Sequence, residues 1–382
     1  MLKRLSVVIL LLFSPNLFSQ WLPDPQIDAK IQRGIGFIYN LEFENADREF
    51  AEVIALRPQH PIGHFFQAMT EWWRILINLE DESRDERFFE MLEKVIEMCD
   101  KRLENNPNDV TALFFKGGAI GFRGRLRANR GSWLAAARDG VVALPIVRKA
   151  FELDPHNYDV LLGIGIYNYY ADVVPREYPL IKPLMIFFPS GDRKKGLEQL
   201  EQAAQFAKYA HIEASYFLMQ NYFSYERDYT KALQLANRLS GMFPRNPIFL
   251  RYKGRCYIRQ GNWVEAYRVF SEVDRRCRQR QVGYGDTDAR EAAYYIGRFL
   301  FLGNNYAEAL EHFYRCDELS RKLDKEGPSG FMSMTNLYIG MIYDLQKKRQ
   351  YAIMQYQKVL RMKEYENSHQ EARRYLQQPY TR

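Results

Sequence analysis

Residues 248–273 read IFLRYKGRCYIRQGNWVEAYRVFSEV, and this stretch decides the fold class. Gly254 is followed twelve residues later by Ala266, and Phe270 follows that alanine by four residues. The apolar residues recur at the spacing of one helix face on both sides of a turn. Small residues at the glycine and alanine positions let two helices approach closely. The stretch therefore predicts an antiparallel helical hairpin.

The same spacing occurs four times in the chain. The four sets are Gly34, Ala46 and Phe50; Gly254, Ala266 and Phe270; Gly297, Ala309 and Phe313; and Gly340, Ala352 and Tyr356. Extending the register gives eight units, keyed by Gly34, Ala68, Gly117, Gly165, Leu218, Gly254, Gly297 and Gly340. Because one hairpin cannot bury its own apolar face, several must stack.

This pattern resembles the tetratricopeptide repeat family. The resemblance implies an all-α superhelix of about eight helical hairpins, forming one domain over residues 20–382. A charged helix at about 368–378 would cover the last hairpin, since terminal repeats need a polar outer face. The family's usual role implies binding of a protein or peptide on the concave surface.

The composition excludes several classes of protein. Of the 382 residues, 47% are hydrophobic and 26% are charged, which is too apolar for a disordered chain. The formal net charge of +7 is spread over a long surface, and it does not by itself argue for a nucleic-acid partner. We therefore expect no nucleic acid among the partners.

Residues 1–19 have the pattern of a secretory signal peptide. Lys3 and Arg4 precede an apolar run over residues 5–13, and Ser19 offers a cleavage position. Leu17 is larger than the usual residue three before a cut, which leaves a retained anchor as the alternative. We expect an exported protein that is periplasmic or associated with the cell envelope, including peripheral membrane association.

Four cysteines are spread widely along the chain, without the C-x-x-C spacing of metal or redox sites. They are Cys99, Cys256, Cys277 and Cys316. Each falls in a helical pattern, where a cysteine often packs as a small hydrophobic residue. The alternative is a disulfide, with Cys277 and Cys316 as the first pair, because export leads to an oxidising environment.

Residues 172–195 depart most from the repeat. This segment is apolar over residues 180–188 and contains four prolines, which argue against a long helix. An exposed apolar loop is costly, so we expect it to fill the hollow of the superhelix. The alternative is a loop that contacts a membrane or a partner. Ser190 or Asp192 would cap the helix that follows.

The neighbourhood of this segment carries a second resemblance. Residues 161–200 are similar to the middle of a eukaryotic tetratricopeptide family that includes an inclusion-body clearance protein of yeast. The matching positions are Gly163, Gly165, Asn168, Pro175, Gly191, Asp192, Arg193, Gly196 and Leu197. The resemblance implies a non-enzymatic adaptor that handles lipid or protein.

The register of the first resemblance places four arginines on the concave face. Arg251, Arg255 and Arg259 lie four residues apart and share one helix face, and Arg298 belongs to the next unit. Like charges at this spacing repel, so an opposing anion would relieve them. These four are the candidate partner-binding residues for an acidic segment. The alternatives are a solvated face, or pairing with Glu291 and Asp344 from neighbouring helices.

The same register in units two to five predicts an aromatic inner wall. Its members are Phe65, Trp72, Trp73, Phe114, Phe122, Tyr169, Tyr170, Tyr222 and Phe223. Either the apolar segment 180–188 covers this wall, or an apolar ligand such as a lipid chain or a peptide occupies it. The second reading would make the protein a carrier or sensor of an apolar ligand.

Two basic stretches could meet anionic headgroups, although charge runs are usually solvated. One carries Arg123, Arg125, Arg127 and Arg130, and the other carries Arg275, Arg276, Arg278 and Arg280. No motif of a hydrolase, metalloprotease or nucleotide-binding site is present in the sequence. We expect no catalytic residue, no metal ligand and no cofactor. The predicted function is a non-enzymatic exported scaffold that binds a protein or peptide.

Overall fold

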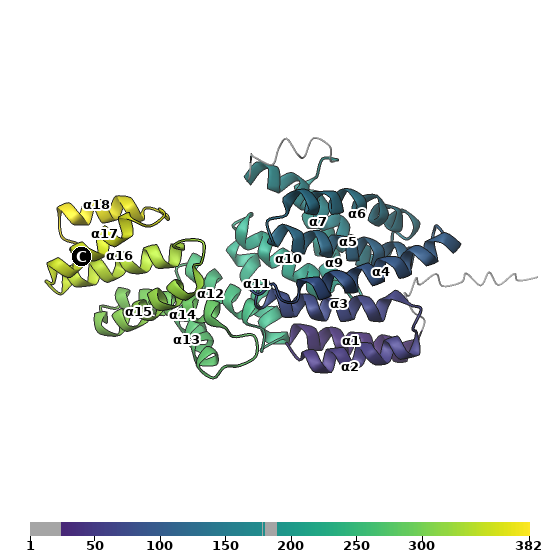
Figure 1. Cartoon of the computed structure of the whole chain (residues 1–382), viewed down its shortest axis with the longest axis horizontal. Coiled ribbons are helices and arrows are strands. Elements are labelled where there is room, and N and C mark those ends of the chain that lie inside the picture. The colour runs from purple at the N-terminus through teal and green to yellow at the C-terminus, as the bar shows by residue number, and fades with distance from the viewer. Residues whose placement is uncertain (1–23, 178, 180–188) are drawn as a thin grey trace, which may run out of the picture.

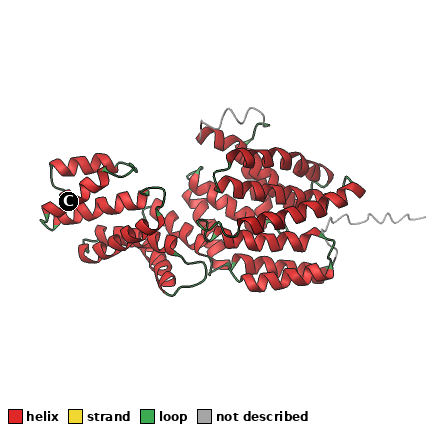
Figure 2. Ribbon diagram, viewed as in Figure 1, coloured by secondary structure: helices red, strands yellow, loops and turns green. Residues whose placement is uncertain are grey.

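The computed structural model describes residues 24–177, 179 and 189–382, so the predicted signal peptide and the apolar segment 180–188 lie outside the described residues. Within the described residues the ordered elements are helices, and no strand is found among them (Figure 2). The all-α prediction is confirmed.

Helices pair in chain order as antiparallel hairpins (Figure 1). The first four pairs are α1 (Pro25–Tyr39) with α2 (Phe43–Leu56), α3 (Pro61–Leu76) with α4 (Asp85–Asn105), α5 (Val110–Asn129) with α6 (Trp133–Leu153), and α7 (Tyr158–Glu177) with α9 (Arg193–Phe206). The next four are α10 (His211–Ser224) with α11 (Tyr229–Met242), α12 (Pro247–Arg259) with α13 (Trp263–Arg278), α14 (Asp286–Leu302) with α15 (Tyr306–Leu323), and α16 (Gly330–Leu345) with α17 (Arg349–Leu360).

These pairs confirm the prediction of eight hairpins. A last helix, α18 (Ser368–Gln377), covers the end of the stack and contacts both α16 and α17. This helix is the predicted cap.

The repeated glycines allow the close packing inside each hairpin. A Cβ atom on Gly254 would lie 2.8 Å from the ring of Phe270, and one on Gly297 would lie 2.8 Å from the ring of Phe313. Both rings are fully buried. The spacing that predicted the fold is therefore a direct contact between the glycine of one helix and the aromatic residue of its partner helix.

The fourth hairpin uses glycine on both helices. A Cβ on Gly196 would lie 2.5 Å from the Tyr169 nitrogen and 2.9 Å from the Gly165 carbonyl oxygen. The backbones of α7 and α9 are therefore in contact. Asp192 caps α9 by accepting a hydrogen bond from the Lys195 N–H at 3.0 Å, as expected.

Helix α7 continues through the first residues of the predicted insertion and ends at Glu177. We expected Pro175 to end this helix, but the helix continues past it. A proline in the last turn of a helix has a helical φ and removes only one hydrogen bond. Residues 180–188, which we expected to fill the hollow, lie outside the described residues.

The first five hairpins and the start of α12 form a closed turn with a common core. Helix α1 lies beside the region of α10, α11 and α12, although these segments are far apart in the sequence (Figure 1). The Asn246 side chain donates to the Tyr39 carbonyl oxygen at 2.9 Å, and the Gln32 side chain donates to the Lys208 carbonyl oxygen at 2.9 Å. The hollow of this turn is the centre of the largest hydrophobic core.

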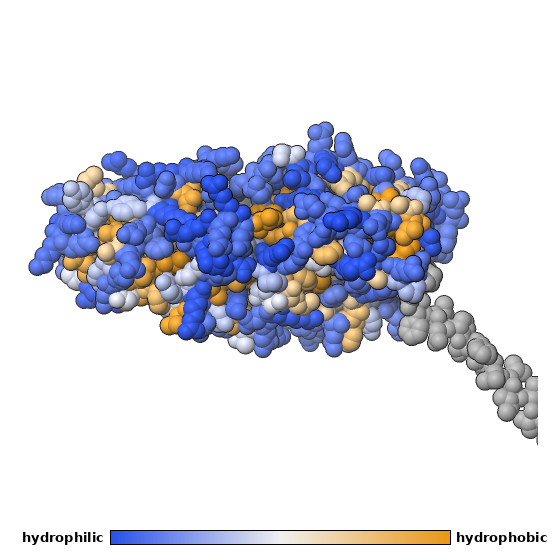
Figure 3. All heavy atoms as spheres, turned by 90° about the horizontal axis from the view of Figure 1, so that it is seen from below, coloured by the Kyte–Doolittle hydropathy of each residue, from blue (hydrophilic) through white to orange (hydrophobic). Residues whose placement is uncertain are grey.

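The last three hairpins and α18 extend from this closed turn and have their own core (Figure 1). Seen from below, the outer surface is mainly hydrophilic, with separate apolar patches (Figure 3). The two parts therefore differ: one has a filled interior, and the other keeps an inner face formed by α12, α14 and α16.

Candidate functional site

The predicted aromatic inner wall is the packed interior of the closed turn. Trp73 is 1% exposed, and its ring centre lies 4.9 Å from that of Tyr39, 5.5 Å from that of Tyr216 and 5.8 Å from that of Phe249. These neighbours come from α1, α10 and α12. Other helices of the chain therefore cover this tryptophan, which neither predicted alternative anticipated.

The remaining wall residues are also packed against protein side chains. Phe65, Trp72, Tyr169 and Tyr222 are buried, and Phe114, Phe122, Tyr170 and Phe223 are half-buried within the same clusters. The prediction of an open apolar groove along these residues is wrong, because closure of the turn converts its inner face into a core. The carrier alternative loses the site on which it depended.

A polar group that the sequence did not reveal lies in this core. The Arg125 guanidinium donates to the Glu213 carboxylate at 2.9 Å, and the Tyr39 hydroxyl donates to the same carboxylate at 2.8 Å. Burial, and then the nearby Glu213 charge, raise the pKa of Tyr39 well above its ordinary value. The Arg125 guanidinium also lies 4.3 Å from the Phe217 ring centre. The ion pair joins α5 to α10, and the Tyr39 hydrogen bond joins α1 to the same carboxylate. These contacts therefore link three helices of the closed turn.

The first basic stretch is neutralised within the protein. Arg123 and Arg127 both pair with Asp139, which is 3% exposed, and Arg130 pairs with Asp85 at 2.6 Å. In the second stretch, Arg275 and Arg276 pair with Glu272 and lower the pKa of this carboxyl group to about 2. These arginines are paired with carboxylates of their own or neighbouring helices.

Two of the four predicted partner-binding arginines are also paired. The Arg255 guanidinium makes two hydrogen bonds to the Glu291 carboxylate, at 2.5 and 2.6 Å, and Arg251 pairs with both Asp288 and Glu291. Burial alone would raise the pKa of Glu291, but the charges of Arg255 and Arg251 outweigh it and the pKa lies below its ordinary value. The predicted alternative of pairing with Glu291 is confirmed.

Asp344, the second predicted partner, binds other groups. Its carboxylate accepts hydrogen bonds from the Arg349 guanidinium at 3.0 Å and from the Tyr356 hydroxyl at 2.9 Å. The pairing of the ladder with Asp344 is therefore wrong, because Arg349 from the start of α17 lies closer to this carboxylate.

Arg298 has a different environment, formed by aromatic rings. Its guanidinium carbon lies 4.8 Å from the ring centre of Trp263, 5.6 Å from that of Tyr294 and 5.5 Å from that of Tyr338. Arg298 is half-buried, and Arg259 is exposed at the end of α12. Within the described part of the chain, neither arginine forms an ion pair.

The Tyr295 hydroxyl is influenced by the charges of several arginines on α12 and α14. Burial raises the pKa of Tyr295 to about 12, and the Glu291 charge acts in the same direction, while the charges of Arg255, Arg298 and Arg259 oppose the rise. The charges of these three guanidinium groups therefore all act on the Tyr295 hydroxyl. We call Arg259, Tyr295, Arg298, Trp263 and Tyr338 the arginine–aromatic cluster.

The aromatic part of this cluster was missed by sequence reasoning. Trp263 begins α13 and Tyr338 lies on α16, so the two residues reach Arg298 from different hairpins. The available signal was Trp263 directly after the turn of the best repeat. Its contact with an arginine of the next unit depends on the rotation between hairpins, which no local pattern contains.

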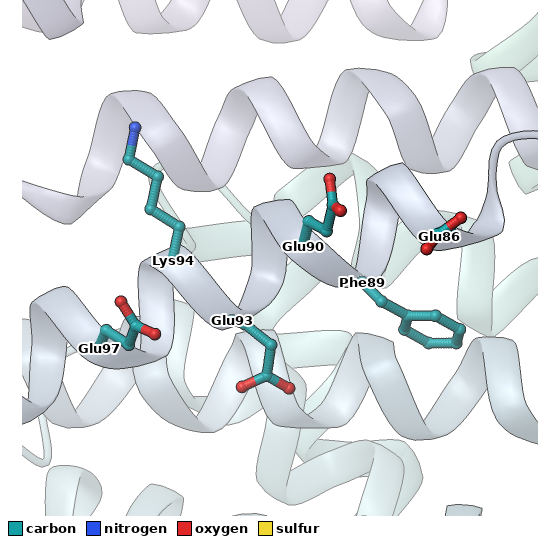
Figure 4. Close-up of a pocket in the computed structure, with 6 residues that line it drawn as sticks. All are labelled: Glu86, Phe89, Glu90, Glu93, Lys94 and Glu97. Atoms are coloured by element: carbon teal, nitrogen blue, oxygen red, sulfur yellow. The ribbon is translucent and has the colours of Figure 1, made fainter.

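The surface of α4 carries a shallow hollow that is not an enclosed binding site. A shallow hollow follows one face of α4, lined by Glu86, Phe89, Glu90, Glu93, Lys94 and Glu97 (Figure 4). All six come from a single helix, and Glu93 is already paired with Arg123. This is an open helix face and not an enclosed site.

Over residues 24–177, 179 and 189–382, no group of three or more His, Cys, Asp or Glu side chains could hold a metal ion. Among the helices described, none combines the length and the apolar character needed to span a bilayer.

All four cysteines are free, so the predicted disulfide alternative is not found. Cys99, Cys256 and Cys316 are buried and Cys277 is half-buried. Burial raises the pKa of each thiol to about 12. The cysteines therefore pack as small hydrophobic residues.

Comparison with known proteins agrees with this architecture in one segment. Residues 221–280 match the family described as "Tetratricopeptide repeat". This segment runs from the end of α10 through α13 and contains Arg259 and Trp263. No curated protein matches the sequence.

Several solved structures are similar in arrangement at low sequence identity. The C-terminal part of a tetratricopeptide repeat-containing protein from Cytophaga hutchinsonii is 15% identical over 76% of this chain and 95% of that chain, with a TM-score of 0.38. PilF of Pseudomonas aeruginosa is 14% identical over 68% and 96% of the two chains, with a TM-score of 0.44. Yeast Tom70 is 12% identical over 89% and 86%, with a TM-score of 0.38.

The family match and the eight stacked hairpins point the same way. The glycine and aromatic residues that define the repeat pattern are in contact within the hairpins that carry them. Residues 221–280 therefore match the tetratricopeptide repeat, and the rest of the described chain continues the same stack of helical hairpins.

Proposed function

We propose that this protein is an exported, non-catalytic scaffold that recruits a partner by binding an acidic segment at Arg259 and Arg298. One observation carries the proposal. In the part of the chain that the structure describes, neither of these two arginines forms an ion pair, although the Glu366 charge acts on Arg298, while their neighbours Arg251 and Arg255 are paired.

The aromatic rings around Arg298 prepare it for an incoming carboxylate. A guanidinium group over aromatic faces gains about 0.5–2 kcal/mol, which keeps the side chain in one place. A ring face attracts the guanidinium charge without accepting a conventional hydrogen bond, so this contact leaves the N–H donors for an incoming carboxylate. Two parallel N–H groups match the two oxygens of a carboxylate, and such charge-assisted bonds are the strong ones.

Arg259 supplies a second positive charge on the neighbouring hairpin. It is exposed at the last position of α12, and the Tyr295 ring of α14 stacks on the Phe270 ring of α13. A peptide with two acidic residues, or one acidic residue beside an aromatic residue, would match this surface. Export rests on the signal-peptide pattern of residues 1–19 alone.

A peptide selection tests the proposal. Purified protein would be used to select binders from a random peptide library, and the selected peptides would then be titrated against the wild type and Arg298→Gln. We expect acidic peptides to be enriched. We expect their affinity to fall by at least about tenfold in the variant, since a charge-assisted hydrogen bond is worth about 1.5–3 kcal/mol.

Arg268→Gln is the matched control. Arg268 belongs to the neighbouring sixth hairpin, where it is exposed on α13 and pairs with Glu265 of the same helix. Its replacement should leave binding unchanged. Selection without acidic enrichment, or equal losses in the two variants, would show that the arginine–aromatic cluster is not the binding surface.

A further inference from the structure

The C-terminal tail returns to the inner face of the last hairpins. Helix α18 ends at Gln377, and the backbone of Gln378 is extended. The Tyr380 N–H then donates to the Asp344 carboxylate of α16 at 2.8 Å. The Arg382 guanidinium donates to the Leu302 carbonyl oxygen, at the end of α14, at 2.7 Å. Figure 1 accordingly places the C-terminus near α16 and α17.

The surface under the tail has hydrogen-bond acceptors that are held in place by residues outside the tail. The Asp344 side chain is 0% exposed, and Arg349 and Tyr356 hold its carboxylate in place. Leu302 is the last residue of α14, where carbonyl groups have no partner within the helix and the helix dipole favours a cation. A backbone N–H and a basic side chain are therefore the groups that this surface accepts.

An aromatic contact lies between these two polar contacts. The Tyr380 ring centre lies 6.3 Å from that of Phe301 and 5.1 Å from that of Tyr375. Tyr380 is half-buried. We call Asp344, Phe301 and the Leu302 carbonyl group the tail seat.

The tail itself is held by few contacts. Gln378, Pro379, Thr381 and Arg382 are exposed, and the tail is not part of a helix. An attached segment needs little intrinsic affinity, because its effective concentration at the seat is on the order of millimolar. A free segment of the same chemistry can therefore compete with the tail once it is present at a comparable concentration.

We propose that the tail seat is a second binding groove of this scaffold, with the chain's own C-terminus as its internal occupant. The partner that fits is an extended segment in which an aromatic residue is followed two residues later by arginine or lysine. The aromatic residue packs on Phe301, its backbone N–H donates to Asp344, and the basic side chain donates to the carbonyl groups that end α14. This groove uses neither Arg259 nor Arg298, so the inference goes beyond the proposed function.

A competition experiment with the full chain tests this inference. The probe is a fluorescent peptide with the sequence of residues 377–382, QQPYTR, and binding is followed by fluorescence anisotropy. Wild-type protein would be compared with Arg382→Ala and with Tyr380→Ala plus Arg382→Ala. We expect the double variant to bind the probe at least about tenfold more tightly than the wild type, because its own tail no longer fills the seat.

Gln378→Ala plus Thr381→Ala is the matched control, since both residues are exposed and belong to the same tail. It should bind the probe as weakly as the wild type. A probe with alanine in place of its tyrosine should lose at least about tenfold in affinity for the double variant. Arg382→Ala keeps the test valid if loss of Tyr380 disturbs folding, because Arg382 is exposed and its guanidinium donates to the end of α14.

Equal binding of the probe to all proteins, or no binding to either opened variant, would overturn the inference. Affinity for a selected acidic peptide, measured with the same proteins, reports on the arginine–aromatic cluster. The failure of one proposal is thereby distinguished from the failure of the other.

Discussion

The contact between Gly254 and Phe270 sets the distance between α12 and α13. A methyl group on Gly254 would have to move a fully buried ring, because its Cβ would lie 2.8 Å from the ring. Glycine in the middle of a helix costs about 1 kcal/mol relative to alanine. Its presence at the same position of several hairpins indicates that the packing gain exceeds this cost.

We therefore expect Gly254→Ala to lower the free energy of unfolding by about 1–3 kcal/mol, the usual cost of inserting a methyl group into a packed core. Gly241→Ala is the control, since Gly241 lies in α11 with nothing within 4 Å of its Cβ position. That variant should be neutral or more stable. Urea denaturation measures both, and equal effects would show that the glycine pattern does not report close packing.

Glu291 connects the charge of a single residue to the stability of the fold. Its pKa lies below its ordinary value in the folded protein, so the folded state binds fewer protons than the unfolded state as the pH falls. The stabilisation is therefore complete above the ordinary pKa of glutamate and is lost as the pH falls through the lower pKa of the folded state.

Glu291→Gln leaves Arg255 without its buried partner. We expect it to lower the free energy of unfolding by about 3–5 kcal/mol at pH 7, as is typical of a broken buried ion pair. The difference from the wild type should narrow as the pH falls below the ordinary range of glutamate. Glu318→Gln, at an exposed position, should change the free energy by less than about 0.5 kcal/mol. A constant difference between wild type and Glu291→Gln at all pH values would contradict this assignment.

The four thiols allow a chemical test of burial. Because burial raises the pKa of each to about 12, little thiolate exists at pH 8. Iodoacetamide should label half-buried Cys277 slowly in the folded protein and the other three only after unfolding. Mass spectrometry without reductant should then count four labelled cysteines. Two fewer labels would reveal a disulfide.

At the scale of elements, α12 is fixed at its start by one side chain with two functions. The side-chain oxygen Oδ1 of Asn246 accepts a hydrogen bond from the Ile248 N–H at 3.0 Å, which caps α12, and its side-chain NH₂ group donates to the Tyr39 carbonyl oxygen at 2.9 Å. Asn246 is fully buried. One residue therefore starts a helix and joins it to the first hairpin.

Comparison with a second cap separates these two functions. Asn262 caps α13 in the same way but is exposed. Asn262→Ala should cost about 1 kcal/mol, the usual value of an N-cap. Asn246→Ala should cost about 1–3 kcal/mol more, because it also leaves the buried Tyr39 carbonyl group unpaired. Equal losses in thermal or urea unfolding would show that the bond between α12 and α1 adds nothing.

At the scale of the whole molecule, the sequence predicted the hairpins and not their closure. The signal for a hairpin is local, since Gly254 and Phe270 are only sixteen residues apart. Tyr39 and Glu213 are 174 residues apart, and their contact depends on small rotations added over several hairpins. The total rotation over several hairpins cannot be predicted from a local residue pattern.

Closure of the superhelix also explains why some of the predicted inner-face residues are buried and others are not. The repeat register identified Trp73 and Arg298 as inward-facing, but it could not show which part of the superhelix is closed. In the closed turn, Trp73 became core, while Arg298 lies in the part that extends beyond it. Glu291 could be predicted only as an alternative partner, and Asp288, which pairs with Arg251, was not predicted, because both come from the next hairpin.

The central claim is that the inner face of the last hairpins binds an acidic segment. Hydrogen–deuterium exchange of the full chain, with and without a selected acidic peptide, tests it most directly. We predict slower exchange at the end of α12 and along α14 around Arg298, with no change in α1 to α6. Protection confined to the first hairpins, or unchanged exchange at saturating peptide, would contradict the account.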